Sequence, residues 1–171
     1  MIINHIKIEH IVPDVHAITR EMTSSSQIAI IVKRFLSLPI QSKIALTVNN
    51  IAYLPLLAKK DFATGIKLLC ELEILQKNLH NNNKTVHLHS QMTDMAFALK
   101  NTSVFDYFVS LSKTYHFKPG IITYNPEIAI HFFSQLIKKY SFVIATPVSK
   151  SKKAFQKYAA TSQQEFIDMK G

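Results

Sequence analysis

Residues 103–146 read SVFDYFVSLSKTYHFKPGIITYNPEIAIHFFSQLIKKYSFVIAT, and this stretch contains two helix-strand units in succession. Apolar residues recur at helical spacing until the proline and glycine of residues 118–120, which are expected to end the first helix. Short apolar runs at 121–124 and 142–146 predict two strands, and a second helix is predicted to begin at Pro126. Strands joined by helical crossovers of this kind are expected to pair in parallel.

The same alternation extends toward the N-terminus. The predicted strands lie at residues 5–12, 43–48, 84–89, 121–124 and 142–146. The most regular helical pattern runs over residues 61–79, where leucines repeat on one helical face. Apolar spacing also predicts a last amphipathic helix over residues 151–169. Strands with little internal alternation indicate a parallel sheet covered on both faces.

The chain length fits one domain. Because 171 residues can enclose a sizeable core, residues 1–171 are predicted to form a single α/β domain. About five mostly parallel strands alternating with helices are typical of a flavodoxin-like, doubly wound sandwich, which is the preferred architecture. The alternative is a partial β/α barrel, which would leave an apolar flank in need of a partner.

The composition indicates a soluble protein of a reducing compartment. Cys70 is the only cysteine, so a disulfide framework is excluded and the cytoplasm is the expected location. The N-terminal residues alternate apolar and polar side chains and lack the long apolar region of a signal peptide. No uncharged apolar run approaches the roughly 18 residues of a membrane-spanning helix.

The charge distribution favours an anionic partner. The formal net charge is +9, and six lysines but no Asp or Glu occur between Glu127 and Glu165. Such a field attracts phosphates and other anions, so a small anionic ligand is the expected partner. Nucleic acid is a less favoured partner because Arg20 and Arg34 are the only arginines. Whether the chain forms a homo-oligomer stays open.

Polar side chains follow several of the predicted strands. Ligands of parallel α/β folds bind where the carboxyl ends of the strands meet. The expected ligand-binding residues are Asn49, Asn50, Thr123, Tyr124, Asn125, Thr146 and Ser149. The expected catalytic residues are His87, His89 and Lys150.

His87 and His89 lie two positions apart in a predicted strand, so their imidazoles are expected on the same side of the sheet. Both are candidates for proton transfer or for hydrogen bonding to a substrate, and a purely structural role is the alternative. Two imidazoles would also suit a metal ion, but the nearest carboxylate in sequence is Asp94. No metal site is therefore predicted, and no cofactor is identified.

Ser149 and Lys150 follow the last predicted strand beside further lysines. Hydroxyl groups, a helix N-terminus and ammonium groups together suit a phosphate or carboxylate. Lys150 is also a candidate amine nucleophile, although a polar loop favours an ordinary exposed amine.

Several familiar motifs are missing from the sequence. With three glycines, the chain has no P-loop and no GxGxxG motif, and it contains neither GxSxG nor HExxH. The leading hypothesis is a small α/β enzyme or enzyme-like domain that binds an anionic metabolite at the strand ends; whether it is catalytic stays open. The alternative is a noncatalytic binding or assembly module that contacts nucleic acid or an acidic partner through its lysine-rich C-terminal third.

Overall fold

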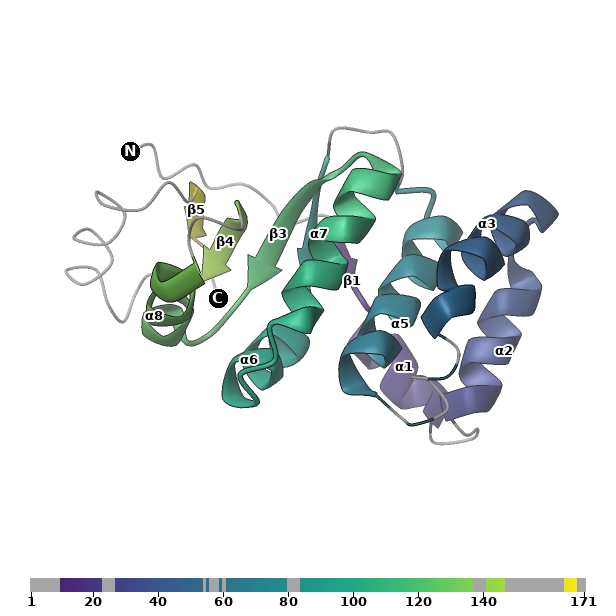
Figure 1. Cartoon of the computed structure of the whole chain (residues 1–171), viewed down its shortest axis with the longest axis horizontal. Coiled ribbons are helices and arrows are strands. Elements are labelled where there is room, and N and C mark those ends of the chain that lie inside the picture. Colours follow the sequence, from purple (N-terminus) through teal and green to yellow (C-terminus); the bar gives the residue numbers. More distant parts are fainter. Residues whose placement is uncertain are drawn as a thin grey trace.

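Helices alternate with short strands along the chain in the computed structural model, which describes residues 10–22, 27–53, 55, 59, 61–79, 84–136, 141–146 and 165–168. The strands are β1 (Ile11–Val12), β2 (Thr85–Leu88), β3 (Lys118–Ile122), β4 (Val143–Thr146) and β5 (Glu165–Asp168). The helices are α1 (Val15–Met22), α2 (Gln27–Ser37), α3 (Ile40–Asn50), α5 (Phe62–Gln76), α6 (Ser90–Ala98), α7 (Ser103–Tyr115) and α8 (Pro126–Leu136), with a 3-10 turn, η1 (Ile51–Tyr53), after α3 (Figure 1). None of the helices in these ranges is long and apolar enough to cross a membrane.

The strands form one parallel sheet in the order β1-β2-β3-β4-β5. The predicted α/β class, a parallel sheet alternating with helices, is confirmed, and it is consistent with the flavodoxin-like expectation at that level. The strand order, which the sequence did not predict, is sequential. Because neighbouring strands of a β/α barrel follow the same order, the partial-barrel alternative stays open.

Three of the five predicted strands are strands in the structure, as β2, β3 and β4; of the predicted strand over 5–12, residues 11 and 12 form β1, and residues 5–9 lie outside the described part of the chain. The prediction of a strand over 43–48 was wrong, because these residues lie within the helix α3. Ile44 and Val48 lie four residues apart and are exposed, whereas Leu46 between them is buried. A short, largely apolar run such as IALTV does not distinguish a strand from a helix, and here the helical register places the β-branched residues outside.

Three further differences concern where helices and strands occur. Residues 118–120 were predicted to end a helix, but they form the first half of β3. Helix α6 was not predicted, because its sequence SQMTDMAFA has few apolar residues at regular spacing. The predicted final helix over 151–169 is contradicted at 165–168, which form β5; its residues 151–164 lie outside the described part of the chain.

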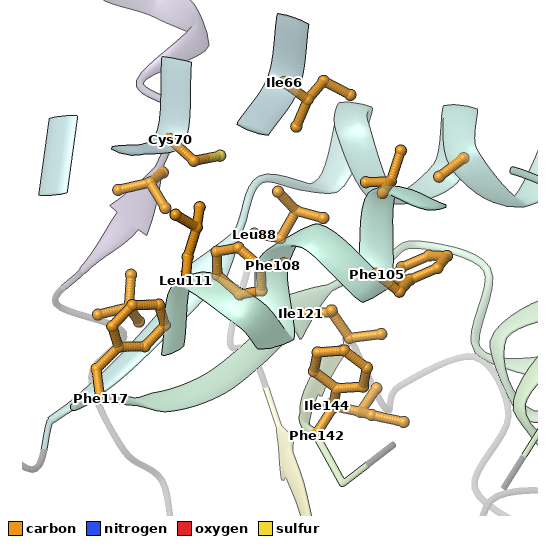
Figure 2. Close-up of a cluster of buried hydrophobic side chains, with 14 of the residues drawn as sticks. Ile66, Cys70, Leu88, Phe105, Phe108, Leu111, Phe117, Ile121, Phe142 and Ile144 are labelled. Carbon is orange, nitrogen blue, oxygen red and sulfur yellow. The ribbon is translucent and has the colours of Figure 1, made fainter. Parts of the chain in front are cut away.

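One face of the sheet packs against helices. Val12, Val86, Leu88, Ile121 and Ile144 share a buried cluster with side chains of α5, α6, α7 and α8. Figure 2 shows phenylalanine rings from α7 and from the segments before β3 and β4 gathered in this cluster. Cys70 of α5 is fully buried there, as expected of a core-filling cysteine.

The other face carries a separate, smaller apolar cluster of Ile122, Val143 and Ala145, with Ile11 packed against it. His87 alternates with the helix-facing residues Val86 and Leu88 of β2, so its imidazole lies on this second face. Its neighbour on β3 is Gly120.

Candidate functional site at the carboxyl ends of β1 and β2

His89 is the predicted catalytic residue that the structure places at a strand end. It follows the last residue of β2 and is the N-cap of α6, where its Nδ1 accepts a hydrogen bond from the Gln91 N–H at 3.2 Å. The ring is half-buried and lies edge-on to the ring of His16, with 6.2 Å between the centroids. Burial, and next the neighbouring His16, lower the pKa of His89.

Asp14 and Glu73 lie near His89, since both carboxylates act electrostatically on its pKa and oppose the lowering. Asp14 follows β1 and its Oδ1 accepts from the Ala17 N–H at 2.9 Å, which caps α1 and lowers the pKa of Asp14. Glu73 comes from α5 and accepts from the Asp14 N–H at 2.7 Å. This bond joins the end of β1 to α5.

A pocket of about 290 Å³ opens beside these groups, between α1, α2 and α5. Three cations and three carboxylates line it: Lys33, Arg34, Lys77, Asp14, Glu21 and Glu73. Asp14 and Glu73 line the pocket and their charges also act on His89, which is not itself one of the lining residues.

Arg34 organises one wall of the pocket. Its guanidinium donates to both carboxylate oxygens of Glu21, at 2.9 and 3.3 Å, and this pairing lowers the pKa of Glu21. The third guanidinium nitrogen, Nη1, lies 3.8 Å from Glu73. Glu73 is also paired with Lys77 one helical turn later, at 2.5 Å. Lys33 is exposed and forms no ion pair within the described residues.

His87, the second histidine predicted to be catalytic, does not reach this site. It is buried in mid-strand, with its ring against Gly120, whereas His89 has left the strand and lies against His16 of α1. Burial, as the largest effect, lowers the pKa of His87 to about 4. The two imidazoles therefore have different neighbours, and in the part of the chain that the structure describes no three His, Cys, Asp or Glu side chains gather as metal ligands.

The carboxyl end of β3 adjoins that of β2 and holds three more of the predicted residues. Thr123 is buried, and its hydroxyl donates to Asp94 of α6 at 2.5 Å and accepts from the Asn125 N–H at 3.0 Å. Tyr124 and Asn125 are exposed beside it. Thr146, at the end of β4, is fully buried. Ser149 and Lys150 lie outside the described residues.

Asn49 and Asn50 were predicted at a strand end, and this placement was wrong because 43–48 is helical. Both lie in the last turn of α3 and bind Glu71 of α5, through their side-chain amides at 3.1 and 2.7 Å. Tyr115 donates to the same carboxylate at 2.7 Å, and the Lys67 ammonium lies 3.3 Å from it. Burial, and next the Glu71 charge, raise the pKa of Tyr115.

The sequence did not single out the pocket-lining residues. One signal was present: Glu73 and Lys77 stand at i and i+4 on the most regular predicted helix, a spacing typical of a helical ion pair. Glu21 and Arg34, which pair with each other, come from two other helices, so no spacing in the sequence indicates their contact.

No protein-family model matches the chain, and neither the curated proteins nor the solved structures compared with it give a match.

Proposed function

We propose that the chain is a small α/β enzyme or enzyme-like domain that binds an anionic metabolite at the carboxyl ends of β1 and β2, with His89 as the proton-donating or hydrogen-bonding residue. The observation that carries the proposal is the position of His89 at the carboxyl end of β2, where parallel α/β folds bind ligands, under the influence of two carboxylates that line a charged pocket.

The hydrogen bonding of His89 favours a donor role. Because its pKa is lowered, the imidazole is neutral at neutral pH, and a neutral ring carries one N–H. Nδ1 accepts from Gln91, which assigns the hydrogen to Nε2. A neutral imidazole at a helix N-terminus can donate to a carbonyl, carboxylate or phosphate oxygen without placing a second cation in the site.

The charges of the pocket support an anionic ligand. Arg34 and Lys77 are each paired with a carboxylate, so their charges are largely compensated. Lys33 lines the same pocket, is exposed and forms no ion pair in the described ranges, although its charge acts on Glu21. An anion bound in the pocket would therefore supply a counter-charge for Lys33, and we propose that the Nε2–H of His89 is its second donor.

The experiment is a thermal-shift titration with inorganic phosphate and with small phosphorylated and carboxylated metabolites. We expect saturable stabilisation by at least one compound, because a ligand that binds only the folded state raises the melting temperature. His89→Asn, which keeps a side-chain acceptor at the helix N-cap, and Lys33→Gln should each abolish the shift.

The matched controls are His116→Asn and Lys113→Gln, which change exposed residues at the end of α7. Both should retain the shift. A shift that survives His89→Asn and Lys33→Gln would overturn the proposed site. Stabilisation by duplex DNA alone, collapsing at moderate salt, would instead favour the basic-module alternative.

A further inference from the structure

An apolar stripe runs along the outward sides of α2, α3 and η1, and it consists of large aliphatic side chains that are 49 to 75% exposed. Its members are Val32, Leu36, Ile40, Ile44, Val48 and Ile51. Ile30 of α2, Leu46 of α3 and Leu38 between the two helices are buried instead, Leu38 and Leu46 against Leu72 of α5. Figure 1 shows α2 and α3 together at one end of the molecule, remote from β4 and β5.

The size of the stripe matches a protein interface. At roughly 100 Å² of apolar surface for each large aliphatic side chain, six residues that are half to three-quarters exposed present on the order of 400 Å². One partner in a standard interface contributes about 800 Å², of which about 500 Å² is apolar in homodimers. The stripe thus provides most of the apolar area that a dimer needs.

The neighbours of the stripe favour a protein rather than a lipid surface. In α2 the charged residues are the exposed Lys33 and the buried Arg34; within α3, Lys43 is the only charged residue, and the other polar residues are Gln41, Ser42, Thr47 and two asparagines. Interfacial membrane helices carry many lysines or arginines and bulky aromatic anchors. Depletion of charge around an aliphatic centre is typical of the core of a protein interface.

The spacing of the stripe points to a second copy of this chain. Ile40, Ile44 and Val48 lie four apart within α3, so this helix presents an i±4n ridge. A two-fold axis brings identical surfaces together, and interdigitation of two i±4n ridges is the commonest class of helix packing. We infer that the chain forms a two-fold symmetric dimer in which α3 packs on α3 of the second copy, with Ile44 at the centre.

The test is the oligomeric state of the full chain by sedimentation velocity over a concentration series. Wild type should reach twice the 19.5 kDa mass of the monomer. Ile44→Asp places two like charges at the axis and should weaken dimerisation more than about tenfold, with an unchanged circular dichroism spectrum. Leu99→Asp, at an exposed apolar residue that follows α6, should remain dimeric.

A second experiment locates the axis. Ile44→Cys should give a disulfide-linked dimer under mild oxidation, whereas Leu99→Cys should not, and the buried Cys70 should not react in either. A monomer at all concentrations, a dimer that Ile44→Asp leaves intact, or Ile44-dependent binding of the monomer to phosphatidylglycerol vesicles would each overturn the inference.

Discussion

The imidazole of His87 on β2 lies directly over Gly120, its partner on β3. A β-carbon at position 120 would stand 2.4 Å from Cδ2 of the ring and 2.7 Å from Nε2, far inside van der Waals contact. The histidine ring thus occupies the space that any side chain at position 120 would need. Gly120 has no positive φ, so its backbone conformation does not require a glycine. The contact with the His87 ring is what requires one.

The first prediction follows from this contact. Gly120→Ala should destabilise the fold by about 1–3 kcal/mol, because the ring must move within a packed face. Gly65→Ala is the matched control: its β-carbon would meet nothing within 4 Å, and alanine inside a helix should stabilise by about 0.5–1 kcal/mol. Chemical denaturation measures both changes.

The double variant His87→Ala with Gly120→Ala isolates the contact. Once the ring is absent, the alanine at 120 should cost less than it does in wild type, giving a coupling energy on the order of 1 kcal/mol. If Gly120→Ala lowers the free energy of unfolding equally in wild type and in His87→Ala, the ring and the glycine are independent.

The second prediction concerns pH. The folded pKa of His87 is about 4 against 6.5 for the free side chain, so between these values the unfolded chain binds a proton that the folded chain does not. Stability should therefore fall as pH drops from 6.5 to 4, by about 3 kcal/mol from this residue. Unfolding free energies of wild type and His87→Leu across this window measure the effect; parallel curves for the two proteins would contradict it.

Local sequence signals were sufficient for most of the fold. Strands 84–89 and 142–146 were predictable because short apolar runs stand between polar loops and helical patterns. Residues 43–48 carry the same local signal but form a helix, since their position is decided by packing of Leu46 against α5. Gly120 was taken as part of a break because the reason for a glycine in this strand, the room that the His87 ring needs, depends on a residue distant in sequence.

The candidate site was predictable only where it coincides with a strand end. His89 was found on that basis, but the pocket beside it is built from helices. Asp14 and Glu73 are 59 residues apart and meet through a single hydrogen bond. Glu21 and Arg34 belong to two successive helices. No local sequence pattern specifies these contacts, because they depend on how α1, α2 and α5 pack against one another.

The third prediction is that Cys70 is chemically inert in the folded protein. It is fully buried in α5, and burial, followed by the charges of Glu73 and Glu71, raises the pKa of its thiol well above the usual value. Because the thiolate is the reactive form, native protein should not be labelled by a thiol reagent, whereas denatured protein should be labelled at one site per chain. Rapid labelling of native protein would contradict the burial.

The last prediction concerns the buried ion pair of Lys67 and Glu71. The ammonium also donates to Asn50 Oδ1 at 2.6 Å and lies 4.5 Å from the centre of the Tyr53 ring, so both charges are fully engaged. Lys67→Met leaves Glu71 buried without its cation and should cost about 3–5 kcal/mol. The double variant Lys67→Met with Glu71→Leu removes both charges, so it should cost less than the sum of the single variants. Denaturation of the four proteins gives the coupling energy, and strict additivity would show that the pair does not act as a unit.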